Sequence, residues 1–585
     1  MANIMSLKSL RNKTSRNGFD LSFKKNFTAK AGELLPVMVK EVLPGDSFKI
    51  NLKSFTRTQP VNTAAFARMR EYYDFYFVPY DLLWNKAGTA LTQMYDNPQH
   101  AVSLDPTKNF VLNGDMPYCT TEDISFYLSN LLRKPTSSFP VNNYFGYSRA
   151  SCSAKLLEYL GYGNFYTYVN GEAPDWQDSP RIANLELNLF GLLAYQKIYA
   201  DYYRDSQWER ISPSTFNVDY LSGDNMKVDF LSDVFMQNYN FFDLRYCNWQ
   251  KDLFHGVLPR QQYGDVATVS YPSAVSNLGA ATLTNGTLRE FQGDQDPTFK
   301  SATVGNITLT DPVSISAFSI LALRQAEFLQ KWKEITQSGN KDYKDQIEKH
   351  WGVSAGDALS EMCTYLGGIS SSLDINEVVN TNITGDNAAD IAGKGTGVSG
   401  GSINFNAGAK YGLIMCIYHC LPMLDYTTDF VDTAFTKINA ADYAIPEFDR
   451  VGMQAVPLIH MMNPLASEIK ISNPESLILG YAPRYIDYKT SFDVSVGAFK
   501  DTLKNWVISY GNQSLINQLG YEDPTGSPVP SLGDVNYTMF KVNPNSLNPL
   551  FAVAVNSELS TDQFLCSSFF DVKVVRNLDT DGLPY

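Results

Sequence analysis

Residues 68–84 read Arg-Met-Arg-Glu-Tyr-Tyr-Asp-Phe-Tyr-Phe-Val-Pro-Tyr-Asp-Leu-Leu-Trp, and this aromatic stretch decides the fold class. Aromatic rings occupy alternate positions, which is the pattern of a strand with one face on a core. The ring-bearing positions are Tyr73, Phe75 and Phe77. The intervening positions, which we expect to face solvent or another molecule, are Tyr72, Asp74 and Tyr76.

Pro79 sets the end of this strand, because proline has no backbone N–H to donate to a neighbouring strand. We therefore expect the strand to end near Val78 and a short helix to follow over Asp81–Met94.

Two further strands are predicted before it, over Leu34–Leu43 and Ser47–Phe55. Pro44-Gly45-Asp46 lies between them and is a turn signal. Three consecutive strands favour an antiparallel sheet.

Later segments give isolated elements between long irregular connections. The predicted helices span residues 184–210 and Ser316–Gln337, and the predicted strands span residues 403–424, 485–496 and 564–576. The stretch 403–424 is almost continuously apolar, as in a strand buried on both faces. Residues 97–180, 264–312 and 382–401 have little periodicity and are predicted to be loops. The simplest architecture is one antiparallel sandwich with very large connections.

Composition is that of a globular protein, with 44% hydrophobic and 18% charged residues among 585. The net charge of −14 argues against a protein coated with basic surface. Residues 1–30 nevertheless carry seven Lys and Arg against one Asp, a balance of +6 that leaves −20 on the other 555 residues. This basic N-terminal arm is either an anion-binding tail or a solvated terminus.

The seven cysteines are scattered and odd in number, so no disulfide framework is visible and a reducing compartment is expected. We find neither a signal sequence nor an apolar run of roughly 18 residues, and expect a soluble intracellular product without membrane insertion.

Two motifs resemble ligand-binding sites by their spacing. Cys416, His419 and Cys420 have a metal-like spacing, but in a strand His419 points away from the two thiols, so they are better interpreted as buried strand residues. Gly395-Thr396-Gly397-Val398-Ser399-Gly400 matches G-x-G-x-x-G without the required strand before it and helix after it. We interpret that stretch as a flexible loop.

The sequence indicates no catalytic centre, metal site or cofactor. Carboxylate pairs such as Glu447 and Asp449 are explained by turn chemistry, and no nucleophile motif accompanies the five histidines. We therefore expect a protein that is not an enzyme. The histidines are His100, His255, His350, His419 and His460.

Several blocks together resemble the major capsid protein of the Microviridae, in the gokushovirus-like group of tailless icosahedral single-stranded-DNA phages. They run in order along the chain: residues 19–22, 32–46, 55–84, 193–208, 248–265, 317–368, 411–426, 446–458, 480–499 and 574–585. The block at 248–265 reads Asn-Trp-Gln-Lys-Asp-Leu-Phe-His-Gly-Val-Leu-Pro-Arg-Gln-Gln-Tyr-Gly-Asp.

The resemblance implies a mainly β, eight-stranded antiparallel jelly roll with very long inter-strand insertions that contain some helices. Residues 31–585 would form this single domain after the basic arm of residues 1–30, with the large insertions within about 97–402. It also implies self-assembly into a T=1 icosahedral shell around circular single-stranded DNA, so the protein would reside in the virion after assembly in the cytoplasm of the bacterial host.

Partners and binding residues follow from the same resemblance. The expected partners are further copies of the chain, the packaged DNA, a small basic DNA-binding protein, a pilot protein and the host cell surface. Residues 264–312 are the first choice for an exposed loop that attaches to the host, and 97–180 the second. Because the genome is a polyanion, we assign DNA binding to the arm. The candidate residues are Lys8, Arg11, Lys13 and Arg16.

A second interpretation is a carbohydrate-binding or glycoside-cleaving β-sandwich protein. It requires paired carboxylates in an aromatic cleft, and no pair in this sequence is distinguished in that way.

Overall fold

The chain is described here by a computed structural model. The described residues are 15–92, 116–133, 145–167, 175–176, 184–221, 226–228, 241–264, 320–354, 356, 360–379, 391–427, 431–461, 478–510, 535, 537–552 and 562–580. They divide into two compact units, one within residues 1–261 and 361–585 and the other within residues 262–360.

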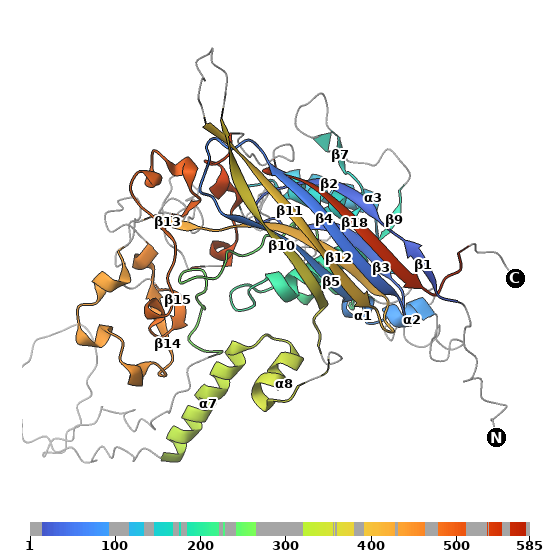
Figure 1. Ribbon diagram of the computed structural model, residues 1–585. Helices are drawn as coiled ribbons and strands as arrows, with labels where there is room; N and C mark the ends of the chain where they lie inside the picture. Colours follow the sequence, from blue (N-terminus) through green and yellow to red (C-terminus); the bar gives the residue numbers. More distant parts are fainter. Residues whose placement is uncertain are drawn as a thin grey trace, which may run out of the picture. The chain divides into compact units, whose positions relative to one another are not determined.

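One large antiparallel sheet dominates the first unit (Figure 1). Its strands are β1 Asn17–Asp20, β2 Phe23–Ala29, β3 Leu35–Val42, β4 Ser47–Thr58, β5 Met69–Pro79, β10 Thr364–Val379, β11 Ile391–Asn406, β12 Gly412–Pro422 and β18 Phe564–Arg576. The strand order is β1-β18-β4-β11-β10-β5-β12-β3, and β2 pairs with β18 beyond the end of β1. The mainly β class that the sequence predicts is confirmed.

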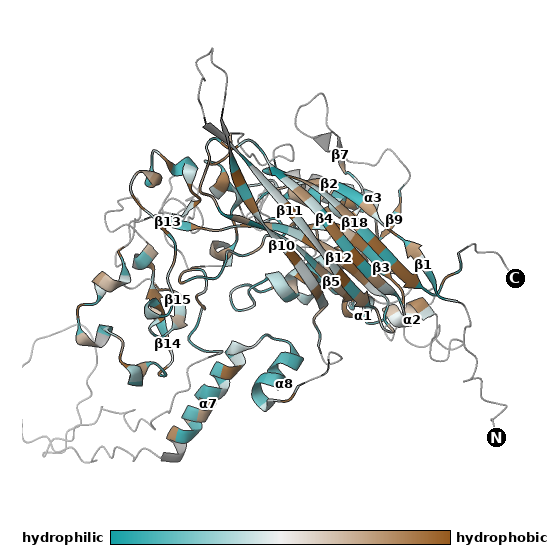
Figure 2. Ribbon diagram, viewed as in Figure 1, coloured by the Kyte–Doolittle hydropathy of each residue, from teal (hydrophilic) through white to brown (hydrophobic). Residues whose placement is uncertain are grey.

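The sheet curls so that its two halves face each other. Strands β10 and β11 pair only through residues 373–379 and 391–397, and beyond that point β10 follows β5 while β11 follows β4. Side chains from opposite halves then meet: the Tyr73 hydroxyl lies 2.5 Å from Ser54 Oγ, and the rings of Phe77 and Phe405 are 4.8 Å apart. The aromatic core lies between the halves. Figure 2 shows hydrophobic and hydrophilic residues alternating along β4 and β18.

Strand β5 confirms the prediction for the aromatic stretch. Tyr73 and Phe75 are completely buried, and the strand ends at Pro79. The short helix that we expect after it is present as two pieces, α1 Tyr80–Leu83 and α2 Ala87–Thr92.

The other face of β5 differs from the prediction. Helix α5 Phe190–Ile198 continues into a π-helical turn, η2 Tyr199–Tyr203, that covers this face. The Tyr76 ring packs 5.0 Å from that of Tyr202, and Tyr76 is 3% exposed. The expectation that Tyr76 faces solvent or another molecule is therefore wrong, because a long insertion of the same chain returns to this surface.

The remaining strand predictions have mixed outcomes. The bounds of β3, β4 and β18 agree with the sequence, but β3 pairs with β12, while β4 pairs with β11 and β18. The single strand predicted over 403–424 is instead the end of β11, a turn at 407–411 and then β12. The strand predicted over 485–496 is wrong. Strand β15 Ile478–Pro483 precedes that segment, and Tyr485 then adopts a positive φ of 59°, which ends the extended chain.

Residues 97–180 contain two helices where the sequence predicts loops, α3 Thr121–Arg133 and α4 Arg149–Leu160. Helix α4 buries Arg149 and Lys155, so its buried face is not marked by apolar residues alone. Lys155 Nζ lies 2.6 Å from Glu33 Oε2 and 2.9 Å from Asp562 Oδ2. Burial by itself lowers the pKa of Lys155, but the two carboxylates outweigh it and hold that pKa well above its usual value.

Smaller elements complete the first unit. The short strands are β6 Tyr118–Thr120, β7 Tyr166–Thr167, β8 Asp175–Trp176, β9 Glu186–Asn188, β13 Asp425–Thr427, β14 Met453–Pro457, β16 Val494–Ser495 and β17 Ser509–Tyr510. The 3₁₀ turns are η3 Pro213–Thr215, η5 Thr433–Thr436, η6 Ala440–Asp442, η7 Pro446–Phe448, η8 Leu458–Met461, η10 Ile486–Tyr488, η11 Gly497–Lys500, η12 Lys504–Trp506, η13 Tyr537–Phe540 and η14 Pro544–Leu547. A second apolar core, which includes Phe254, Tyr426 and Phe540, lies among some of these elements.

The second unit contains α7 Ile320–Ser338 and α8 Tyr343–Trp351. Helix α7 agrees with the prediction over Ser316–Gln337, and Trp332 stacks on His350 of α8 with 5.8 Å between ring centroids. Of the exposed loop expected at 264–312, all but Gly264 lies outside the described residues.

Strand β11 is the clearest correction, because the sequence predicts a loop over 382–401. Its glycines allow the two halves of the sheet to approach closely. A Cβ atom on Gly395 would lie 2.4 Å from Thr58 Cγ2 and 2.8 Å from Leu373 Cδ2. The motif at 395–400 is thus part of a paired strand rather than a flexible loop.

We predict that Gly395→Ala lowers the free energy of unfolding by about 1–3 kcal/mol, because the added methyl group has no room. The matched control is Gly400→Ala in the same strand, where the nearest atom is 3.6 Å from the added Cβ. Urea unfolding of the unassembled subunit measures both. Equal effects of the two substitutions would contradict the close-approach explanation.

Candidate functional site

The basic arm is described only in part. Lys8, Arg11 and Lys13 lie outside the described residues. Arg16 lies immediately before β1, where its guanidinium donates hydrogen bonds to the Gly45 carbonyl oxygen at 2.5 Å and to Ser47 Oγ at 3.2 Å. Arg16 therefore fastens the arm to the turn before β4, and its environment is structural.

Other cations near the N-terminus are also used within the chain. Lys25 in β2 donates to the Tyr159 carbonyl oxygen at 2.8 Å, and burial lowers the pKa of Lys25 to about 8. Lys24, the residue before it in the strand, is exposed. The second half of the arm is thus part of the sheet through β1 and β2.

The Cys416, His419 and Cys420 motif lies in β12, which is buried on both faces. His419 stacks on Tyr72 at 4.9 Å between ring centroids, and burial lowers the pKa of His419 to about 3. Among the described residues, no group of three His, Cys, Asp or Glu side chains is placed to hold a metal ion. The interpretation of these three as buried strand residues is confirmed.

His419 adjoins a tyrosine network around Asp74. The hydroxyls of Tyr203 and Tyr365 donate to Asp74 at 3.0 and 3.2 Å, and Tyr76 donates to Tyr203 at 3.0 Å. Burial raises the pKa of Asp74. The network joins β5 and β10 to the π-helical turn, so its role is to fasten the insertion to the sheet.

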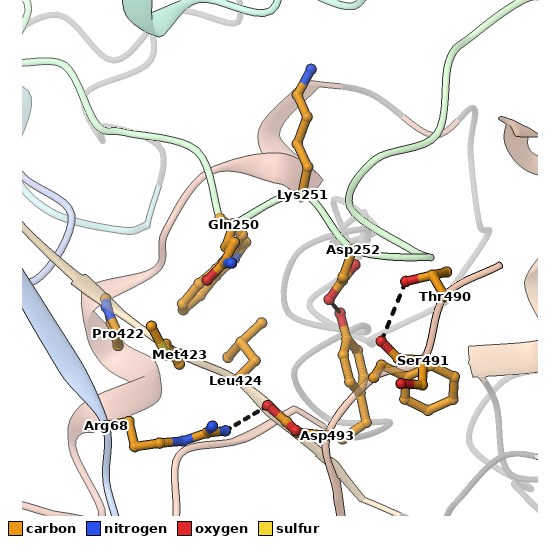
Figure 3. Close-up of a pocket in the computed structure, with 13 residues that line it drawn as sticks. Arg68, Gln250, Lys251, Asp252, Pro422, Met423, Leu424, Thr490, Ser491 and Asp493 are labelled. Atoms are coloured by element: carbon orange, nitrogen blue, oxygen red, sulfur yellow. Dashed lines mark hydrogen bonds and ion pairs between the residues drawn. The ribbon is translucent and has the colours of Figure 1, made fainter. Parts of the chain in front are cut away.

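A cavity of about 370 Å³ lies beside the residue that opens the aromatic stretch (Figure 3). Its walls come from residues 249–252, 422–426 and 490–493 together with Arg68. Arg68 points toward Asp493, and their ion pair measures 2.6 Å. Lys251 extends away from the cavity.

Hydrogen bonds fix the carboxylate of Asp252 and the hydroxyl of Tyr426 in the wall of this cavity. The Tyr426 hydroxyl donates to Asp252 Oδ2 at 2.5 Å and lies 2.6 Å from His255 Nδ1. Burial raises the pKa of Asp252, but hydrogen bonds from His255 and Tyr426 outweigh it and leave that pKa below its usual value. The Asp252 carboxylate and the Tyr426 hydroxyl are thus held in place. This arrangement is suited either to joining the segments that carry them or to binding another molecule.

Sequence reasoning did not single out this cavity. Its walls come from three distant segments, and a single sequence does not reveal which of them meet. The signal in the sequence that could have pointed to this cavity is the family resemblance, because residues 248–265 and 411–426 are two of the blocks that carry it.

The carboxylates Glu447 and Asp449 also lack a catalytic setting. Both are exposed, and Asp449 forms an ion pair with Lys489.

Within the described residues, no helix is long and apolar enough to cross a membrane.

We predict that His419→Phe flattens the acid limb of the stability curve. Burial depresses the folded-state pKa of His419 from 6.5 to about 3, so below pH 6.5 the unfolded chain takes up a proton that the folded chain does not. The wild-type free energy of unfolding then falls by up to about 1.4 kcal/mol per pH unit as pH decreases between these values.

Phe keeps the stack on Tyr72 and does not titrate. The raised pKa of Asp74 acts in the opposite direction, and because Asp74 Oδ2 lies 3.8 Å from His419 Nδ1, the same comparison in an Asp74→Asn background separates the two groups. Denaturant titrations of the unassembled subunit between pH 4 and 7 provide the measurement. Parallel curves for the two proteins would contradict the prediction.

Comparison with known proteins supplies the context for these features. Residues 8–115 and 170–585 match the family described as capsid protein (F protein). Capsid protein VP1 of Chlamydia phage 1 is 22% identical over 638 aligned residues, which cover 97% of this chain and 95% of the relative. Capsid protein VP1 of Bdellovibrio phage phiMH2K is 23% identical over 507 residues, covering 81% of each chain.

These matches extend over most of the chain, including both strands that form the ends of the large sheet. They confirm the resemblance to Microviridae capsid proteins that the sequence blocks indicate. The chain therefore belongs to the phage capsid protein (F protein) family, and its role is structural.

Proposed function

We propose that this chain is the subunit of a T=1 icosahedral shell that encloses circular single-stranded DNA. The observation that carries the proposal is the family match over residues 8–115 and 170–585, on a β scaffold with one insertion that covers the outer face of β5. The subunit assembles in the cytoplasm of the bacterial host and remains in the virion.

The scaffold of this subunit is an eight-stranded jelly roll, formed by β2, β3, β4, β5, β10, β11, β12 and β18. The antiparallel pairing supports this assignment. The first of these strands pairs with the eighth, the second with the seventh, the third with the sixth and the fourth with the fifth. These nested pairs are those of one long hairpin that folds over on itself into a two-sheet sandwich. Residues 31–585 then form one domain with insertions within about 97–402.

DNA binding belongs to the first part of the arm. Lys8, Arg11 and Lys13 precede β1, whereas Arg16 is occupied with the turn before β4. Cations that neutralise phosphates bind nucleic acid without sequence preference, which suits a container. Because residues 31–585 are acidic, a small basic protein supplied in trans carries much of the neutralisation, and a pilot protein completes the particle.

Attachment to the host surface belongs to the insertion that includes residues 264–312. Its support is the separate compact unit within residues 262–360, which includes exposed side chains such as Phe328 and Trp351. A compact unit between two strands of the large sheet can vary without altering the pairing of that sheet.

We predict that the purified wild-type protein forms uniform round particles containing DNA, as seen by negative-stain microscopy and nuclease-protected nucleic acid. Replacing Lys8, Arg11 and Lys13 with Gln removes three positive charges from the arm, so shells still form but contain less DNA.

Arg16→Gln is the matched control, because it also removes one arm charge but breaks the contacts to Gly45 and Ser47. We expect Arg16→Gln to affect the stability of the subunit more than the DNA content of the particles. Wild-type protein that stays monomeric under every assembly condition would refute the shell, and an unchanged DNA content in the triple variant would refute the arm.

We predict that deletion of residues 270–305 leaves particle yield intact and reduces adsorption to host cells, because this stretch falls in the sequence between β5 and β10 and includes none of the residues described in the large sheet. Adsorption of purified particles to cells measures the effect. A deletion that prevents folding would show instead that the segment is structural.

A further inference from the structure

Residues 431–451 present a row of large apolar side chains to solvent. The chain here consists of three consecutive 3₁₀ turns, η5, η6 and η7. Ile438 and Phe435 have 87% and 82% of their surface exposed. Other exposed members of the row are Tyr443, Phe448 and Val451. We refer to these five side chains and Tyr488, which is also exposed, as the 431–451 surface.

The turns that present this surface are capped by their own side chains. Asp432 accepts a hydrogen bond from the Ala434 amide at 2.8 Å. Asp442 accepts from the amides of Ile438 and Asn439 at 3.0 and 2.8 Å. The backbone that displays Phe435 and Ile438 is therefore ordered before any partner binds, which reduces the entropy lost on docking.

Ion pairs fasten the same turns to the body of the unit. Lys437 pairs with Asp487, and Lys489 pairs with Asp449. Because these four charges already have partners within the chain, a second molecule can cover the apolar side chains next to them without leaving these four charges unpaired.

Ring contacts connect two members of the surface, Tyr488 and Phe448, through Tyr485 and Arg484. Lys437 Nζ lies 3.8 Å from the centre of the Tyr488 ring, and Arg484 lies over both Phe448 and Tyr485 at 5.7 and 5.2 Å. Tyr485 contacts Tyr488 edge to face at 6.4 Å. The surface thus continues from η5 through η10 to η7.

Tyr485 has a positive φ of 59°, an unfavourable conformation for a bulky residue. Such strain persists only where the surroundings hold it, and here the Tyr485 amide donates to Gln454 Oε1 at 3.0 Å. This turn places Tyr488 beside Lys437.

The exposed apolar area of the 431–451 surface is at the upper end of the range for a monomer surface. A large apolar or aromatic side chain offers about 150–250 Å² when fully exposed, so six that are half to nine-tenths exposed present about 600 Å². The largest apolar patch on a typical monomer is about 300–600 Å², and one side of a stable interface buries about 800 Å².

We propose that the 431–451 surface docks against a neighbouring copy of this chain. The inference rests on the proposed shell function. A partner that covers the surface on every subunit must be present once per subunit, and a second copy meets this condition by symmetry. An apolar, aromatic centre with a rim of paired charges also matches the composition of protein interfaces.

The first test replaces Ile438 with Asp, and Ile438→Leu is the matched control that keeps an apolar side chain. Ile438→Asp places a charge within the contact, so particle yield by sedimentation falls at least tenfold while circular dichroism and the monomer elution volume stay unchanged. Ile438→Leu assembles as the wild type does. A normal particle yield from Ile438→Asp overturns the contact between copies. This holds also if those particles then fail to bind another virion protein or a host cell.

The second test does not require a destabilising change. All seven native cysteines are buried, so Ile438→Cys provides a thiol that is accessible in the free subunit. A maleimide labels this thiol rapidly in subunits and in dissociated particles, and at least tenfold more slowly in intact particles. Equal labelling rates in particles and subunits overturn the contact.

Failure of the contact and failure of the shell give different results. A wild-type protein that never assembles overturns both. Wild-type particles together with normal Ile438→Asp particles, or with an accessible Ile438→Cys thiol, overturn the contact alone.

Discussion

Lys155 lies buried between two carboxylates, and the arrangement of the large sheet with its insertions depends on this ion cluster. Glu33 follows β2, Asp562 precedes β18, and Lys155 comes from α4 in a connection between β5 and β10. Three distant segments therefore meet at one ammonium group. Removing one member of such a buried pair typically costs about 3–5 kcal/mol, because the remaining charge stays in the interior. An arrangement of α4 that separates Lys155 from Glu33 and Asp562 is therefore strongly disfavoured, whereas apolar packing tolerates several arrangements.

Insertions held in this way change what the sheet presents to other molecules. The outer face of β5 is covered by the chain's own π-helical turn, and β12 is buried on both faces. The outer face of β4, β11 and β18 stays open, with Phe55, Val398 and Phe569 exposed. In the shell that we propose, contacts between subunits therefore have two kinds of surface available, this open face of the sheet and turns such as residues 431–451.

The sequence predicts best those elements whose pattern and environment agree. Strands β5, β12 and β18 follow from alternating or continuous apolar residues, and α7 follows from helical spacing. Strand β11 was missed because glycine has low strand propensity, whereas the nearness of Thr58 and Leu373 excludes larger side chains. Helix α4 was missed because its buried face includes Arg149 and Lys155, whose partners are more than 90 residues away in sequence. The cavity beside Arg68 required three separate segments to be brought together, and the DNA-binding role of Lys8, Arg11 and Lys13 stays a prediction.

The burial of all seven cysteines affects how the protein behaves in oxidising surroundings. Burial raises the pKa of Cys566 to about 12 and that of Cys416 well above its usual value, so hardly any thiolate forms at neutral pH. Thiolate is the species that reacts with oxidants and disulfides. These buried thiols are therefore expected to react slowly with oxidants and disulfides while the chain stays folded. In the shell that we propose, the same burial disfavours disulfide cross-links between subunits after the particle leaves its host.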